Sequence, residues 1–146
     1  MGNIKILISC HKQSIVPDSE IMLPIEVGAD LRSKHIEGYI QDNSGDNISA
    51  KNKMYCELTA QYWAWKNLDA DYYGFFHYRR YLNFSENKYP LDSWQNITEE
   101  RLNDTCLKKY NLNDDCIRNL VETYDIVLSE EKNVAKMPDR NASVYE

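Results

Sequence analysis

Residues 72–81 read Tyr-Tyr-Gly-Phe-Phe-His-Tyr-Arg-Arg-Tyr. The aromatic run predicts a buried strand, because aromatic side chains fit a pleated, half-buried surface. The run ends in His77, Arg79 and Arg80. If the strand continued through them, the two arginines would point to opposite faces of the sheet. Guanidinium groups bind phosphate through two parallel hydrogen bonds, and open α/β sheets bind ligands at the carboxyl ends of their strands. We therefore expect an anion site there; the alternative is a strand end whose arginines pair with surface carboxylates.

A second cluster of polar residues follows the first strand of the chain. Residues 4–9 form a short apolar run, and Cys10, His11 and Lys12 come directly after it. Strand, helix and strand in succession predict a parallel pair with a crossover. Both polar clusters would then lie at one edge of the sheet, where they could span a nucleotide base and its phosphates. A solvated turn is the alternative for residues 10–12.

Residues 49–68 predict the clearest helix. Asn47 or Ser49 can cap its first turn, and a mostly apolar stripe at helical spacing runs through Met54, Leu58, Gln61, Trp65 and Leu68. Residues 45–49 precede this helix, whose free N–H groups attract anions. Simple capping explains the same residues equally well. Glu57 lies among aromatic neighbours, where it either holds an arginine of the site or sits at the helix surface.

The other elements are predicted from shorter patterns. Strands are expected at 25–29 and 124–128, a loop at 30–48 with an extended piece around Tyr39, and a further loop at 83–97. One helix begins near residue 98, and another, capped by Asp114 or Asp115, continues through Thr123.

Composition narrows the classes of function. The net charge of −6 argues against a nucleic-acid-binding surface. An anionic ligand would need a local positive patch, for which the candidates are Lys12, Lys51, Lys53, Arg79 and Arg80. No stretch approaches the ~20 apolar residues of a membrane span, and the start lacks the pattern of a signal peptide.

No metal site is predicted from spacing. The four cysteines show no metal-type pattern, which favours reduced thiols in a cytoplasmic protein. Residues 69–71, Asp-Ala-Asp, look like a metal-binding Asp-x-Asp motif. They precede the aromatic strand, however, so we expect them at the opposite edge of the sheet, in a helix-to-strand turn.

Several blocks together resemble a bacterial family, the uncharacterised-domain family of capsular and exopolysaccharide biosynthesis proteins. They are residues 8–12, 27–29, 45–52, 55–67 and 77–81. Members of that family look like GT-A-type glycosyltransferases, and some are associated with galactofuranosyl transfer from a UDP-linked donor. The resemblance implies an α/β, GT-A-like (Rossmann-like) fold with a mostly parallel sheet flanked by helices. Because family domains run longer, we expect residues 1–146 to be a single amino-terminal, donor-binding portion whose sheet is incomplete at its carboxyl-terminal end.

The resemblance also implies roles for individual residues. Cys10, His11 and Lys12 would border the nucleotide of a UDP-sugar, with Lys51 beside the donor. Asp46 and Asn47 would reach ribose or sugar hydroxyls. As catalytic groups, Arg79 and Arg80 would neutralise the leaving diphosphate, and His77 would donate to a phosphate oxygen or a sugar hydroxyl.

The remaining expectations concern partners and alternatives. With arginines on the diphosphate a metal is dispensable, although Mn²⁺ or Mg²⁺ stays compatible with such a donor. The acceptor would be a polysaccharide or lipid-linked glycan, met in the cytoplasm or at the inner face of the membrane. A non-catalytic nucleotide-sugar-binding or interaction module is the alternative. A phosphoesterase using His77 is weaker, because no metal cluster supports it.

Overall fold

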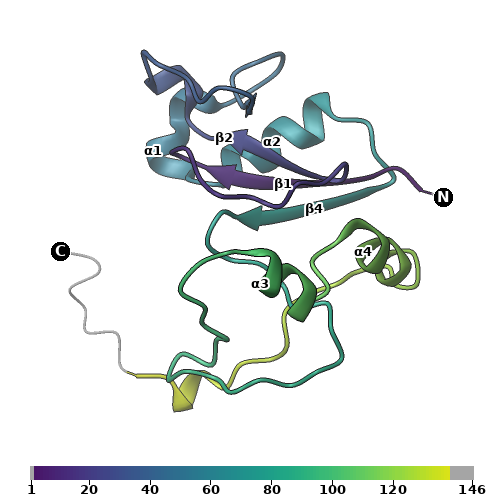
Figure 1. Cartoon of the computed structure of the whole chain (residues 1–146). Helices are drawn as coiled ribbons and strands as arrows, with labels where there is room; N and C mark the ends of the chain where they lie inside the picture. Colours follow the sequence, from purple (N-terminus) through teal and green to yellow (C-terminus); the bar gives the residue numbers. More distant parts are fainter. Residues whose placement is uncertain (1, 139–146) are drawn as a thin grey trace.

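The structure is a computed structural model, and it describes residues 2–138. A four-stranded sheet in the order β3-β2-β1-β4 forms its centre (Figure 1). All three pairings are parallel. The strands are β1 (Ile4–Cys10), β2 (Met22–Glu26), β3 (Ile40–Gln41) and β4 (Tyr72–His77).

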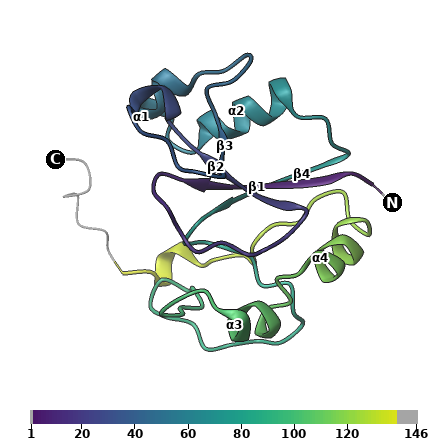
Figure 2. The ribbon, with the colours of Figure 1, turned by 45° about the horizontal axis from the view of Figure 1, so that its top comes forward.

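Helices cover both faces of this sheet, as Figure 2 shows most clearly. On one face lies α2; on the other lie α3 and α4 with the loops that connect them. The helices are α1 (Asn52–Tyr55), α2 (Leu58–Asn67), α3 (Asp104–Lys109) and α4 (Asp114–Val121), with 3-10 turns at Ala29–Leu31, Ser49–Lys51 and Val134–Lys136. The expected α/β sheet flanked by helices is thus observed.

Alternation along β1 builds a core on each face of the sheet. Ile4, Ile6 and Ile8 pack in the cluster that includes Ile117 of α4. Leu7 packs on the other face, in a cluster with α2 residues. Because β1 is central and covered on both sides, it reads as a nearly continuous apolar run.

The predicted helix at 49–68 is interrupted. Cys56 has φ 48° and ψ −129°, a left-handed conformation that ends α1 and separates it from α2. The apolar stripe expected from the sequence was also wrong, since Leu58 and Trp65 are exposed. Small residues face the sheet instead: Ala60 and Ala64 are fully buried beside Trp63. The helix thus packs on the sheet through two alanines and a tryptophan.

Two predicted strands need correction. The strand expected at 25–29 is β2, which begins at Met22 and ends at Glu26. Gly28 then takes a φ of 68° and starts a 3-10 turn. The segment 124–128 forms no ladder in the described part of the chain, and Ile126 and Leu128 are exposed.

The two later helices begin at asparagine caps. Asn103 accepts a hydrogen bond from the Cys106 N–H at the start of α3. Asn113 does the same for the Cys116 N–H in α4, so the cap precedes the aspartates predicted for it. Both geometries satisfy a free N–H of the first turn.

Candidate functional site

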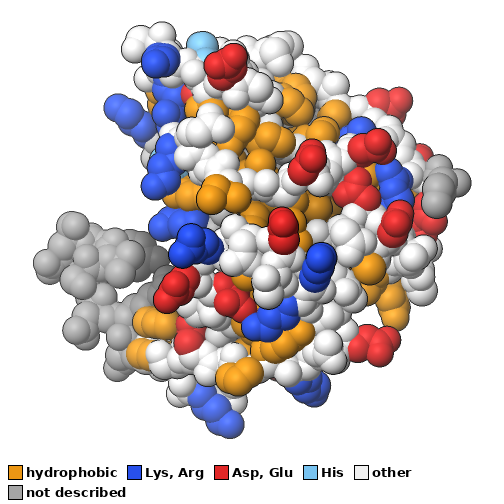
Figure 3. Space-filling model, in the orientation of Figure 1, with side chains coloured by type: hydrophobic (Ala, Val, Ile, Leu, Met, Phe, Trp, Pro, Cys, Tyr) orange, Lys and Arg blue, Asp and Glu red, His pale blue; other side chains and the backbone are white. Residues whose placement is uncertain are grey.

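The candidate site lies where β1 and β4 end. The register pairs Ser9 with His77, so Cys10–Lys12 and Tyr78–Arg80 leave the sheet side by side. Figure 1 shows both arrowheads at the same edge, and Figure 3 shows Lys and Arg side chains gathered along that side of the molecule. The predicted convergence of the two polar clusters is therefore observed.

The ring of Tyr78 is the centre of this edge. The His11 ring meets it edge-on, with centroids 5.2 Å apart. Lys12 Nζ lies 5.8 Å from the ring centroid, and the Arg79 guanidinium carbon lies 5.2 Å from it. An aromatic face attracts cations at such distances. Tyr78 thus gathers positive charge from both strand ends around one ring.

The two arginines lie in a turn and not in the strand. Arg80 N–H donates to the His77 carbonyl at 2.8 Å, and the His77 N–H donates back to the Arg80 carbonyl at 3.3 Å. β4 ends at His77, so the alternation expected for a continued strand does not apply. Both Arg79 and Arg80 are exposed at this edge, and neither forms an ion pair with a described carboxylate.

His77 has one hydrogen bond and one longer contact at its ring nitrogens. Nδ1 accepts a hydrogen bond from the Arg79 N–H at 3.2 Å, and Nε2 lies 3.7 Å from Glu57 Oε1. Burial lowers the pKa of His77 below its ordinary 6.5, partly offset by Glu57; Arg80, Arg79 and His11 lower it further. The imidazole is therefore neutral near pH 7.

Cys10 occupies a different place from its neighbours. Its side chain is buried in the core on the α3–α4 face, and its thiol donates to the Ile8 carbonyl at 3.4 Å. Burial raises the pKa of Cys10 to about 11, against a smaller opposing effect from a hydrogen bond with Tyr39. The thiol is thus protonated and faces the core, whereas His11 and Lys12 are exposed.

Asp46 and Asn47 do not join this cluster. Asp46 accepts a hydrogen bond from Tyr62 Oη at 3.0 Å and lies 3.9 Å from Lys66 Nζ. Tyr62 lies in the middle of α2 and Lys66 near its carboxyl-terminal end, whereas Glu57, just before the helix, meets His77. A helix rises about 1.5 Å per residue, so these partners lie roughly 7–14 Å along the helix from Glu57.

Asn47 and Lys51 have placements of their own. Asn47 accepts from the Ser49 N–H and donates to the Asn43 and Gly45 carbonyls, which fixes its loop. Lys51 is exposed at the end of the 3-10 turn that precedes α1.

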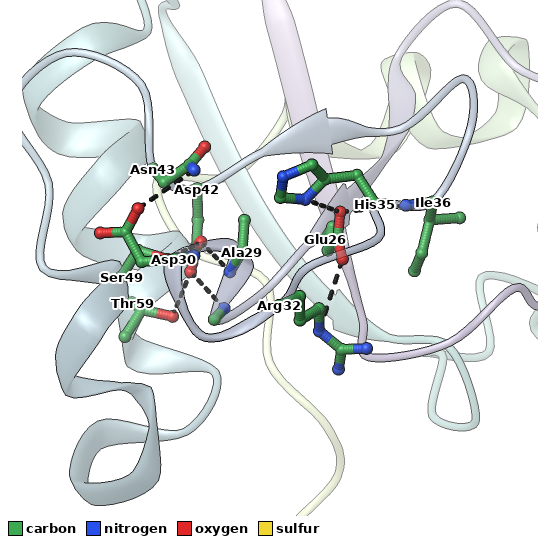
Figure 4. Close-up of polar contacts among 11 residues, drawn as sticks. Glu26, Ala29, Asp30, Arg32, His35, Ile36, Asp42, Asn43, Ser49 and Thr59 are labelled. Carbon is green, nitrogen blue, oxygen red and sulfur yellow. Dashed lines mark hydrogen bonds and ion pairs between the residues drawn. The ribbon is translucent and has the colours of Figure 1, made fainter.

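Two buried carboxylates support the neighbouring edge, at the ends of β2 and β3 (Figure 4). Asp42 accepts from the Gly28 and Ala29 N–H groups and from the hydroxyls of Ser49 and Thr59. Because these donors belong to separate segments, Asp42 ties the loop after β2 to the start of α2.

Glu26 holds the next part of the same loop. It accepts from the Ile36 N–H at 3.1 Å, contacts His35 Nδ1 at 3.2 Å and pairs with Arg32 Nε at 3.4 Å. Its side chain is fully buried. Figure 4 shows Arg32 and His35 approaching the carboxylate from two directions.

Sequence reasoning missed Tyr78 as the centre of the site and left Glu57 undecided. Tyr78 could have been singled out, because it stands between a histidine and two arginines. Asp42 and Glu26 carry no such signal, since isolated acidic residues in polar loops resemble surface residues.

Neither a metal cluster nor a membrane helix is found in the described residues. Among residues 2–138, no group of three or more His, Cys, Asp and Glu side chains is placed to hold a metal ion. Likewise, none of the helices in this part is long and apolar enough to cross a membrane. Asp69 and Asp71 lie before β4, at the edge opposite His77, and Asp71 accepts from the Asn3 N–H.

The fold places the chain in a class of known structures. It is an α/β protein of GT-A-like type, similar to the solved structure of the WbbM bifunctional glycosyltransferase in its apo form. The TM-score is 0.80 at 43% sequence identity, and the match covers 84% of this chain and 22% of the WbbM chain. The chain therefore spans about a fifth of that protein's length.

The chain belongs to the family described as a domain of unknown function, DUF4422, whose model matches residues 5–146. No curated protein matches the sequence significantly.

Proposed function

We propose that this domain binds the nucleotide-sugar donor of a glycosyltransferase, and that the donor is a UDP-sugar. The observation that carries the proposal is the cationic cluster at the joint end of β1 and β4, where Lys12 and Arg79 lie over the Tyr78 ring. Open α/β sheets bind ligands at this edge, and guanidinium groups suit a diphosphate. Similarity to a glycosyltransferase structure supports the same class of function.

In this proposal the arginines act on the leaving group. When the bond between sugar and diphosphate breaks, negative charge grows on the departing phosphate oxygens. Arg79 and Arg80 would stabilise that charge, as prearranged cationic groups do in other transfer reactions. His11 and Lys12 would border the nucleotide from the end of β1. His77 is predicted from the sequence to donate to a phosphate oxygen or a sugar hydroxyl. Its contacts with the Arg79 N–H and Glu57 support a second role, in which the neutral ring orders the turn.

The finer assignments rest on the family resemblance. We propose galactofuranose as the sugar and a surface polysaccharide or lipid-linked glycan as the acceptor, met in the cytoplasm or at the inner face of the membrane. Residues 1–146 would supply the donor-binding portion. Asp46, Asn47 and Lys51 would contribute only if the donor sugar extends from the Tyr78 cluster along α2.

Calorimetric titration with UDP tests the proposal. The purified domain is titrated with and without Mn²⁺, next to the variants Arg79→Ala and Arg80→Ala. We expect binding by the unaltered domain and at least about a tenfold loss in each variant, because a charge-assisted hydrogen bond contributes about 1.5–3 kcal/mol. Arg101→Ala is the charge-matched control, since exposed Arg101 lies outside the cluster. Equal affinity in all variants would refute the assignment of the arginines.

A second function is favoured by one observation. Leu58 and Trp65 of α2 are 52% and 70% exposed, and apolar surface of this kind marks interaction sites when it is contiguous. The chain would then be a non-catalytic binding or interaction module. Sugar transfer from a UDP-sugar by the domain alone would exclude this alternative.

A further inference from the structure

Glu57 and His77 meet at the edge of the cationic cluster, although 20 positions separate them in the sequence (77 − 57). His77 is the last residue of β4, and Glu57 immediately precedes the first residue of α2. The Glu57 carboxylate reaches the histidine ring from the helix side, with Oε1 3.7 Å from Nε2.

The hydrogen bond at Nδ1 determines where the ring proton lies. Nδ1 accepts from the Arg79 N–H at 3.2 Å, so in the neutral ring the proton occupies Nε2. Nε2–H then faces the Glu57 carboxylate. A carboxylate behind a histidine fixes both its tautomer and its orientation, as it does for histidines that bind metals.

The break in the helix is what brings Glu57 to this position. Cys56 adopts φ 48° and ψ −129°, which is costly for a residue with a side chain. Asn52 supports the break, because its amide donates to the Cys56 carbonyl at 2.7 Å and to Thr59 Oγ1 at 3.0 Å. A continuous helix through residue 56 would not direct Glu57 toward the end of β4 in this way.

We propose that Glu57 is a positioning residue of the anion site. It orients the His77 ring, and the ring in turn holds the Arg79 N–H, so that the turn from His77 to Arg80 keeps the shape that presents both arginines to a diphosphate. The inference rests on the proposed function and adds to it the residue that preorganises the donor-binding turn. No contact between Glu57 and the ligand is required.

The charges around His77 fit this arrangement. The cationic or ionisable groups facing it are Arg79 and Arg80 from the turn and His11 from the end of β1, while Glu57 faces it from α2. Loss of the carboxylate would leave only the other three groups, Arg79, Arg80 and His11, none of which is negative. The pKa of His77 would then fall further, and its tautomer would no longer be fixed from the helix side.

The test combines UDP titration with nitrogen NMR of the His77 ring, on Glu57→Ala and Glu57→Gln. We expect Glu57→Ala to weaken UDP binding by up to about fivefold, which corresponds to an exposed charged contact, and to give mixed tautomers. Glu57→Gln keeps an oxygen acceptor for Nε2–H. It should restore the tautomer and most of the affinity, but lower the pKa of His77. Glu37→Ala, an exposed acidic residue in another loop, should change none of these.

The outcomes separate the two proposals. If Glu57→Ala binds UDP as tightly as the unaltered domain while Arg79→Ala does not bind, the positioning role is refuted and the proposed function stands. If the unaltered domain does not bind UDP, the proposed function fails and takes this role with it. Proton occupancy of Nδ1 in the unaltered domain would overturn the inference without any reference to UDP.

Discussion

Asp42 shows how one buried carboxylate organises several segments. It has no exposed surface and accepts four hydrogen bonds, from Gly28, Ala29, Ser49 and Thr59. Asp42→Ala would leave these donors without an acceptor, and each buried unsatisfied group costs about 1–3 kcal/mol. We expect the free energy of unfolding to fall by about 3 kcal/mol or more, measured by urea denaturation.

Asp46→Ala is the matched control for that measurement. Asp46 is an exposed carboxylate only four positions away, with partners at the surface of α2. Its loss should change stability by only about 0.5 kcal/mol. Similar losses in both variants would contradict the structural role assigned to Asp42.

His77 predicts a pH dependence of stability. Its pKa is lowered by burial, so the unfolded chain takes up a proton at this position before the folded chain does. The stabilisation that the neutral His77 ring contributes to the folded state is therefore fully present above about pH 6.5. It declines as the pH falls below that value, until the folded-state pKa is passed.

The variant His77→Asn isolates this effect. Asn keeps an acceptor near the Arg79 N–H but does not titrate. As the pH is lowered from about 7.5 to about 5.5, we expect the free energy of unfolding of the unaltered chain to fall relative to that of the variant. Urea unfolding at each pH measures this difference. Parallel pH profiles for the two proteins would show that the His77 pKa is not lowered.

At the scale of the element, the break between α1 and α2 is a point of strain. Cys56 holds a backbone conformation that glycine adopts freely and other residues adopt at a cost of about 1–3 kcal/mol. Cys56→Gly removes that cost but raises the conformational entropy of the unfolded chain. A net stabilisation of about 1 kcal/mol in thermal or urea unfolding is expected. Cys56→Ala, which keeps the strain and removes the thiol, should not stabilise the chain.

The same break explains which elements could be predicted from sequence. The strands predicted at 4–9 and from residue 72 were found because each is a short apolar or aromatic run, a local signal. The prediction that the aromatic strand is buried was wrong, because β4 lies at the edge of the sheet and its Tyr73 and Phe75 are exposed. The helix at 49–68 was found, but its buried side was not. The left-handed backbone at residue 56 rotates the following helical turns, so different residues of α2 face the sheet. No propensity marks a cysteine for that conformation.

Segments whose state depends on distant partners were predicted less well. Residues 124–128 have the alternation of a strand, yet a strand needs a neighbour to pair with, and none of the described strands pairs with it. The edge carrying His11, Lys12, Arg79 and Arg80 was predicted because parallel topology brings two strand ends together. Glu57 was left open, because its approach to His77 depends on a helix break that is visible only in three dimensions.

At the scale of the whole molecule, the carboxyl-terminal half packs on the sheet through buried apolar side chains. Ile117 of α4 is fully buried in the cluster with Ile4, Ile6 and Ile8, whereas Ile126 is 71% exposed. Ile117→Ala should cost about 2–4 kcal/mol, and Ile126→Ala less than about 0.5 kcal/mol. Equal costs in urea unfolding would mean that α4 does not pack on the sheet as described.

The parallel pairing of β1 has a consequence for how the chain is made. β1 is apolar on both faces, and its partner β4 begins 62 positions after β1 ends (72 − 10). A ribosome adds about 5–20 residues per second, so β1 would wait roughly 3–12 s for that partner to be translated. During this interval one edge of β1 lacks its partner, and the face that carries Ile4, Ile6 and Ile8 waits longer still, until Ile117 of α4 is translated. Folding yield during synthesis should therefore depend on translation speed and on chaperones that shield an unpaired strand.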